Sequence, residues 1–288
     1  MYSINGLRVR RVGEALAVVS PHALDVIERR DPQYKAISML AEKYGVEALA
    51  VIVANALISY RLTLKGEEYW LEFASYFSKA GLPRTAQEIV SAFRGFLSES
   101  RGNRRLVEQK LLRIRRAAPL LEDVASDPLR YSDVGLLVEM LARQLRARRH
   151  EKTIVFAGKM AYYLFKALNV EVRGLERIPL PVDRRVALIT VTSGIADADI
   201  STIVSRPDAA IEAWSEIAKI SSIPAMRLDA VIWLPAAEME KNLRRGLEYA
   251  RDEYARRLVS YSGGSISWPS ARKIASEIVY RFPPNTAL

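Results

Sequence analysis

Apolar side chains recur at helical spacing along most of this chain, and this periodicity constrains its fold more than any other feature. Between residues 106 and 121 one helix face carries Val107, Leu111, Ile114 and Ala118. Residues 134–145 and 154–168 carry two further stripes of the same kind. Only residues 186–192 have the composition of a strand, and one isolated strand cannot build a sheet. We therefore predict an all-α fold.

Proline and turn residues indicate where helices begin and where the chain divides. Because proline suits the first turn of a helix, we expect helices to start near Pro32, Pro83, Pro207 and Pro224. Residues 171–182 are rich in proline and turn-forming residues and interrupt the helical periodicity. We interpret this segment as a linker between two helical lobes.

The chain has no cysteine and only two histidines in 288 residues. These counts exclude disulfides, thiolate zinc sites and iron–sulfur clusters, and they disfavour a histidine-based metal site. The longest apolar run, residues 48–54, is far shorter than the roughly 18 residues of a membrane span, and the N-terminus has no apolar stretch of secretory type. We expect an intracellular protein that has no metal and no contact with membranes.

The net charge is +10, and arginine supplies most of the positive charge, with 32 arginines against 11 lysines. Guanidinium groups pair in a forked geometry with phosphate oxygens, so an arginine-rich basic chain favours a nucleic-acid partner. The 33 acidic residues allow a second interpretation, a heat-adapted surface laced with ion pairs. Charge alone leaves both open.

One constellation of residues is suited to chemistry, and it flanks the linker. Residues 146–153, Arg-Ala-Arg-Arg-His-Glu-Lys-Thr, follow one predicted helix and open another, which is a helix–hairpin–helix arrangement. The unpaired amides at the start of the second helix can bind a phosphate. Lys152 lies within about one turn of that position, where neighbouring arginines and burial would favour the neutral amine that a nucleophile needs. Asp183 is placed as the N-cap of a helix from Arg184, where backbone N–H groups would hold its carboxylate ionised.

A lysine and a carboxylate so arranged fit N-glycosidic cleavage, since the amine attacks the anomeric carbon and the carboxylate stabilises the cationic sugar. Each residue also has an ordinary interpretation. Most lysines are solvated surface groups, and most capping aspartates are only caps. The hairpin also lacks the Gly-hydrophobic-Gly turn usual in such motifs.

Four longer stretches decide between these interpretations, because together they resemble the archaeal 8-oxoguanine DNA glycosylase/lyase family, a divergent branch of the helix–hairpin–helix glycosylases. They lie at residues 28–34, at 55–61 continuing to 65–70, at 147–153 and at 178–187. A fifth, Leu-Asp-Ala-Val-Ile-Trp-Leu at 228–234, is similar. The resemblance covers about residues 25–235, whereas the segment after Pro235 has no clear counterpart.

The resemblance implies a role for each matching residue. Lys152 falls on the nucleophile and Schiff-base former, and Asp183 falls on the assisting carboxylate. The residues expected to hold the excised base are Gln33, Trp70, Phe156, Asp229 and Trp233. Arg148 and Arg149 are expected to contact DNA phosphates, and so is Arg184, which replaces the aromatic residue usual after the aspartate.

The resemblance also implies an architecture and an activity. One lobe, residues 46–172, would be a helical barrel containing the hairpin, and the other would combine residues 1–45 with 173–288, leaving the active site in a cleft between them. The expected enzyme removes 8-oxoguanine from damaged duplex or single-stranded DNA and then cleaves the strand by β-elimination, without a cofactor. We expect a cytoplasmic, nucleoid-associated monomer. The alternatives are a non-catalytic DNA-binding protein that uses the hairpin as a phosphate clamp, and a scaffold with a merely heat-adapted surface.

Overall fold

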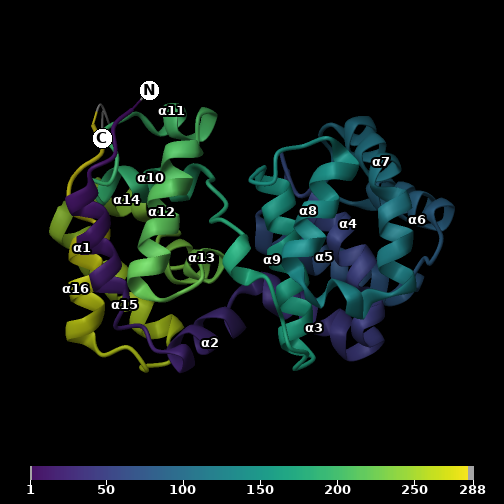
Figure 1. Ribbon diagram of the computed structural model, residues 1–288, viewed down its shortest axis with the longest axis horizontal. Coiled ribbons are helices and arrows are strands. Elements are labelled where there is room, and N and C mark those ends of the chain that lie inside the picture. The colour runs from purple at the N-terminus through teal and green to yellow at the C-terminus, as the bar shows by residue number, and fades with distance from the viewer. Residues whose placement is uncertain (1, 285–288) are drawn as a thin grey trace. The chain divides into compact units, whose positions relative to one another are not determined.

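The computed structural model describes residues 2–284, which form two compact helical units, shown in Figure 1. One unit is residues 32–178, and the other combines the first 31 residues with the chain from Pro179 onward. Within residues 2–284 no strand forms, and β-pairing is limited to the isolated bridges Ile4–Ala196 and Asp133–Arg173. The predicted all-α class is confirmed.

The unit of residues 32–178 is built around α4, whose residues are all buried. This helix packs against α7 and α9. Its complete burial explains why its sequence, LAVIVANALI, is apolar all round rather than striped. The elements of this unit are α3 (Pro32–Tyr44), η1 (Gly45–Ala48), α4 (Leu49–Ile58), α5 (Gly66–Ala80), α6 (Ala86–Glu99), α7 (Val107–Ser126), η2 (Pro128–Ser132), α8 (Val134–Leu145), α9 (Lys152–Ala167) and η3 (Leu175–Arg177).

A lysine is buried within this unit. Lys110 of α7 has no exposed surface and donates a hydrogen bond of 2.7 Å to Asn103 Oδ1. Its ammonium also lies 5.2 Å from the centre of the Tyr60 ring. Because burial disfavours the charged form, the pKa of Lys110 falls to about 8.

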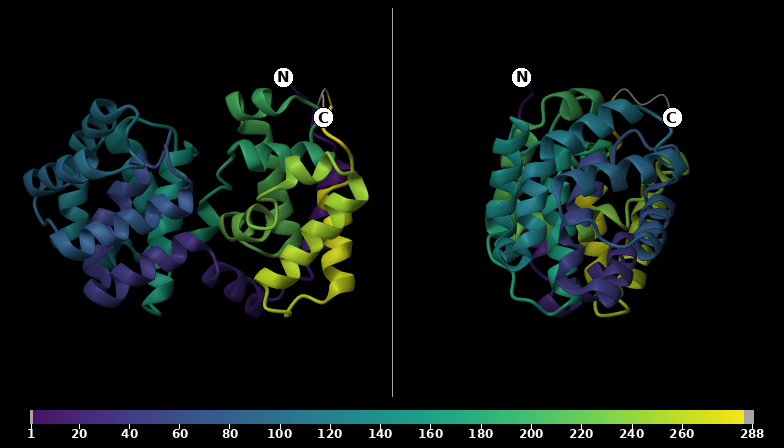
Figure 2. Two further views of the ribbon diagram at one scale, coloured as in Figure 1. Left: turned by 180° about the vertical axis from the view of Figure 1, so that it is seen from behind. Right: turned by 90° about the vertical axis from the view of Figure 1, so that its right-hand side faces the viewer.

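The second unit joins the two ends of the chain. Helix α1 packs against α12 and α16, and α2 packs against α13. Figure 2 shows the purple first helices lying among the green and yellow ones from the later part of the chain. The helices are α1 (Gly6–Leu16), α2 (Pro21–Arg29), α10 (Arg184–Thr192), α11 (Ile200–Ser205), α12 (Asp208–Ser221), α13 (Ala225–Trp233), α14 (Met239–Leu243), α15 (Leu247–Tyr261) and α16 (Trp268–Ile278).

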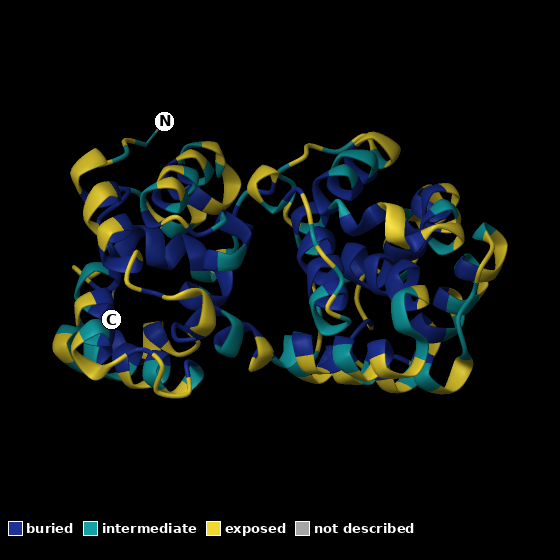
Figure 3. Cartoon of the chain, turned by 60° about the horizontal axis from the view of Figure 1, so that its bottom comes forward, coloured by how far each residue is buried: buried dark blue, intermediate teal, exposed yellow. Residues whose placement is uncertain are grey.

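The boundary between the units lies at Pro32 and Ile178, whereas the sequence placed it at residues 46 and 172. The difference at the first boundary is helix α3, which packs against α5 and α9 and therefore belongs with the middle of the chain. In each unit the buried residues gather inside and the exposed ones on the outer turns (Figure 3). No helix of residues 2–284 is long and apolar enough to cross a membrane.

The helix expected from Arg184 is present as α10. It includes the strand-like residues 186–192, because the Asp183 cap starts a helix and burial accommodates its β-branched side chains. One local prediction needs correction. Pro83 does not begin a helix. Helix α6 starts at Ala86 instead, where Thr85 and Glu88 form a capping box that satisfies two amides at the helix start.

Candidate active site

The predicted hairpin connects α8 and α9. Helix α8 ends at Leu145, and its C-cap residue Arg146 has a φ of 51°, in the left-handed region usually occupied by glycine. The Ala147 amide donates back to the Ala142 carbonyl over 2.9 Å, which closes the end of the helix. This left-handed arginine takes the place of the glycine-containing turn that the sequence lacks.

The other end of the hairpin opens α9 at Lys152. Glu151 occupies the N-cap position, but its side chain makes no capping hydrogen bond. The first amides of α9 are therefore not capped by this carboxylate, which suits an anion-binding helix start. Arg148 and Arg149 are exposed beside it. Lys152 itself is exposed. The sequence analysis expected burial to favour the neutral amine, and the structure does not bury this side chain.

Asp183 caps α10 as predicted. Its Oδ1 accepts a hydrogen bond of 2.9 Å from the Val186 amide. The other oxygen, Oδ2, accepts a second one of 3.0 Å from the indole nitrogen of Trp233 on α13. Both carboxylate oxygens are thus held by N–H donors within one unit, so the group has a fixed orientation.

Trp233 is in turn held by an arginine that the sequence analysis did not select. The guanidinium carbon of Arg185 lies 3.5 Å from the centre of the Trp233 ring, and its Nη1 donates over 3.1 Å to the Trp233 carbonyl. Arg185 therefore covers one face of an indole that was predicted to contact the base. Its neighbour Arg184 instead forms an exposed ion pair of 2.8 Å with Glu240.

A cavity of about 680 Å³ opens beside these groups in the same unit. Asp183 and Trp233 line it, and the segment after Pro235 supplies another part of its wall. The lining carries four positively charged residues, Arg184, Arg185, Lys241 and Arg244, and three carboxylates, from Asp183, Glu238 and Glu240. The cavity is thus a recess with a small excess of positive charge and a fixed carboxylate in its wall.

Asp229 lies on α13, one helical turn before Trp233, and is 5% exposed. Helix α13 is fixed to α2 by Arg227, whose guanidinium makes two hydrogen bonds to Glu28, at 2.9 and 2.8 Å, and one of 2.6 Å to Asp25. Glu28 is 1% exposed, so this pair is shielded from solvent. The contact ties the stretch at 28–34 to the helix that carries the stretch at 228–234.

The remaining predicted base-contacting residues lie in the other unit, on adjacent helices. Gln33 is on α3, and its side-chain amide faces Gly66, the first residue of α5. A Cβ atom at position 66 would lie 4.0 Å from the Gln33 amide nitrogen. Trp70 of α5 and Phe156 of α9 meet edge to face, with ring centres 5.8 Å apart. Trp70 is only 1% exposed, whereas Phe156 is partly exposed. Of these two rings Phe156 is therefore the one with an accessible surface, and Trp70 supports it from behind.

The predicted site thus divides between the units. Residues 32–178 hold Lys152, Gln33, Trp70, Phe156, Arg148 and Arg149, and the other unit holds Asp183, Arg184, Asp229 and Trp233. Sequence reasoning missed Arg185 and also Arg113, which contacts both neighbours of Lys152. Within residues 2–284 no cluster of three or more His, Asp or Glu side chains could hold a metal ion.

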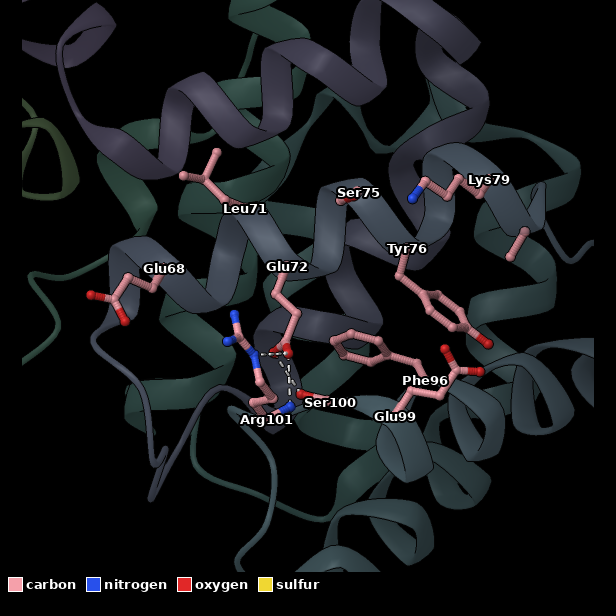
Figure 4. Close-up of a pocket in the computed structure, with 11 residues that line it drawn as sticks. Glu68, Leu71, Glu72, Ser75, Tyr76, Lys79, Phe96, Glu99, Ser100 and Arg101 are labelled. Atoms are coloured by element: carbon pink, nitrogen blue, oxygen red, sulfur yellow. Dashed lines mark hydrogen bonds and ion pairs between the residues drawn. The ribbon is translucent and has the colours of Figure 1, made fainter.

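A larger cavity, of about 850 Å³, lies between α5 and α6 and contains none of the predicted residues (Figure 4). Glu68, Glu72 and Glu99 contribute to its lining. Glu72 accepts hydrogen bonds from the Ser100 hydroxyl and from the Arg101 and Gly102 amides, so it holds the end of α6 in place. Its lining sets three carboxylates against the two cations Lys79 and Arg101, so it lacks the positive excess that favours DNA phosphates, and we assign this cavity a structural role rather than a place in the active site.

Comparison with known proteins assigns the chain to a family. The family model described as "AGOG: N-glycosylase/DNA lyase" matches residues 13–265. An N-glycosylase/DNA lyase of Aeropyrum pernix is 37% identical over 240 residues, which cover 79% of this chain and 82% of that protein. One of Methanopyrus kandleri is 37% identical over 208 residues, which cover 71% and 79%.

A solved structure has a similar fold. It is the 8-oxoguanine DNA glycosylase of Pyrobaculum aerophilum in complex with 8-oxoguanosine, with a TM-score of 0.72 and 28% identity over 90% of this chain and 97% of that one. The family model spans most of the chain, and two relatives above 30% identity cover more than two thirds of it. The chain therefore belongs to the N-glycosylase/DNA lyase family, enzymes that act on DNA in base-excision repair.

Proposed function

We propose that this enzyme excises 8-oxoguanine, with Lys152 as the nucleophile and Asp183 as the assisting carboxylate. The choice of base rests on the similar glycosylase from Pyrobaculum aerophilum, whose structure contains 8-oxoguanosine. The observation that carries the choice of residues is the double anchoring of Asp183. A carboxylate held by two N–H donors at the edge of this cavity is preorganised to stabilise positive charge on a sugar.

The reaction follows from these groups. The Lys152 amine attacks C1′ of the damaged nucleotide, and the bond to the base breaks with its electron pair leaving on the base, which takes up a proton. Opening of the sugar ring and loss of a proton from nitrogen give a Schiff base between Lys152 and C1′. Removal of a C2′ proton then expels the 3′ phosphate, which cleaves the strand. No step in this sequence calls for a cofactor.

The base itself must leave the helix stack and be held by stacking and hydrogen bonds. We assign stacking to Phe156 and to the face of Trp233 opposite Arg185, and hydrogen bonding to Gln33 and Asp229. Trp70 supports Phe156 instead of contacting the base. The proposal therefore draws on side chains from both units.

Contacts with the DNA backbone are assigned to the hairpin. The exposed Arg148 and Arg149, together with the first amides of α9, would bind a phosphate beside Lys152. We propose that a monomer suffices, because one chain supplies both the nucleophile and the carboxylate. Membership of an enzyme family disfavours the alternatives of a non-catalytic phosphate clamp and a heat-adapted scaffold.

The test uses a duplex with one 8-oxoguanine and sodium borohydride. Borohydride reduces a Schiff base to a stable amine, so the wild-type protein should form a covalent adduct visible on a denaturing gel. Lys152→Gln should form none while binding the duplex within a few-fold of wild type. An adduct from the Lys152→Gln protein would show that another residue is the nucleophile, and an adduct only with a different damaged base would correct the substrate.

A further inference from the structure

A single arginine contacts both residues that flank Lys152 in the sequence. Arg113 of α7 donates from Nη2 to Glu151 Oε1 and to Thr153 Oγ1, each over 2.6 Å. The Thr153 hydroxyl also donates to the same Glu151 oxygen over 3.1 Å. These three groups form a closed triangle, and all of them lie in the unit of residues 32–178.

The environment of the triangle makes it firmer than an ordinary surface ion pair. The Arg113 side chain is 22% exposed and that of Glu151 is 40% exposed, so water screens the pair only in part. The pKa of Tyr60 is raised mainly by burial; the charge of Arg113 lowers it and that of Glu151 raises it, so both groups lie close to this ring. Tyr60 belongs to the family-like stretch 55–61, so the charges of the triangle act on a side chain of that stretch.

The triangle also determines what Glu151 does. An N-cap residue normally turns its side chain back to the first amides of its helix, but Glu151 makes no such bond and pairs with Arg113 instead. The chain is therefore held immediately before and immediately after Lys152. A reacting group needs a backbone that does not shift, since a displacement of about 1 Å can cost roughly 100-fold in rate.

We propose that Arg113 is a positioning residue for the nucleophile: by holding Glu151 and Thr153 it fixes the backbone from which Lys152 attacks. This inference rests on the proposed function of Lys152. Arg113 touches neither substrate nor reacting atoms in this account, so removing it should change the rate of the covalent step rather than the affinity for DNA.

The experiment measures the borohydride-trapped adduct in single turnover at saturating 8-oxoguanine duplex, together with the Kd for that duplex and the melting temperature. Arg113→Met keeps an unbranched apolar stem and removes the charge and the donors. It should slow trapping by about 10-fold while Kd stays within about twofold. Arg113→Lys retains a donor and a charge and should recover part of the rate. Arg130→Met is the matched control, because it breaks an arginine–carboxylate pair of the same unit, with Asp123, that includes no neighbour of Lys152.

A second variant guards against loss of folding. Thr153→Val removes only the hydroxyl corner of the triangle and should slow trapping by roughly threefold with an unchanged melting temperature. Wild-type trapping rates in both Arg113→Met and Thr153→Val would overturn the proposal. A weaker Kd with an unchanged trapping rate in Arg113→Met would also overturn it, since Arg113 would then be a DNA contact. If instead the wild-type protein forms no adduct at all, the proposed function itself fails.

Discussion

Replacing Asp183 by asparagine separates its role as a helix cap from its role in the reaction. The carboxylate accepts one hydrogen bond on each oxygen, from the Val186 amide and from the Trp233 indole. Asparagine has the same shape but only one oxygen. The asparagine oxygen can still accept from the Val186 amide and so keep the cap. Its NH2 group then faces the Trp233 indole N–H, and two hydrogen-bond donors stand opposite each other without an acceptor.

The magnitudes differ for the two roles. One lost hydrogen bond and one donor left without an acceptor should lower the free energy of unfolding by about 1–3 kcal/mol, which leaves a typical domain folded. Loss of a preorganised charge at the reacting sugar should slow base release by about 100- to 1,000-fold. The rate should therefore fall far more than any change in the folded fraction can explain.

The assay combines denaturant unfolding with single-turnover release of 8-oxoguanine under conditions in which both proteins are folded. Trp233→Phe is the matched control, because it removes the same indole hydrogen bond and leaves the carboxylate in place. Base release within about threefold of wild type in Asp183→Asn would refute the catalytic role and leave Asp183 as a cap. An equal loss of rate in both variants would assign the effect to Trp233, through its hydrogen bond or its stacking, rather than to the charge of Asp183.

Three further predictions concern the hairpin and the buried lysine. Arg148→Ala should weaken damaged and undamaged duplex equally and reduce the slope of log affinity against log salt by about 1; a loss confined to damaged DNA would contradict a phosphate contact. Arg146→Gly should raise the free energy of unfolding by about 0.5–1 kcal/mol, because glycine adopts the left-handed conformation without strain, and a lower denaturation midpoint would contradict this. The pKa of Lys110 is about 8 in the folded protein, against an ordinary lysine pKa of 10.5, so between these pH values the unfolded chain binds a proton that the folded protein does not. The free energy of unfolding should therefore rise from pH 8 to pH 10, by up to about 1.4 kcal/mol per pH unit, and fall as pH is lowered again. If Lys110→Met shows an equal rise, the pH dependence belongs to another titrating group.

Local sequence signals predicted the parts of the fold that depend on local physics. The stripe through Val107, Leu111 and Ile114 became α7, because packing one face of a helix needs only that spacing. Asp183 was predicted as a cap from its position alone, and its Oδ1 accepts from the amide three residues later. In both cases the partners lie within a few residues.

Features that depend on distant partners escaped prediction. The burial of Trp70 follows from its packing against Phe73 and Phe156, which no local pattern reports. The contact of Arg113 with Glu151 spans 38 residues, and that of Arg185 with Trp233 spans 48. The sequence offered one weak signal for Arg185: it directly follows Asp183 and Arg184, which were both predicted to be functional.

The construction of one unit from both ends of the chain sets the order in which the protein can assemble during synthesis. Helices α1 and α2 leave the ribosome first, but their partners α12, α13 and α16 are made last. At about 5–20 residues per second, the apolar faces of α1 and α2 stay uncovered for roughly 10–40 s before α12 is complete. Residues 32–178 are contiguous and can fold within that interval. Nascent chains halted before α12 should thus protect α4 from proteolysis while α1 is still cleaved.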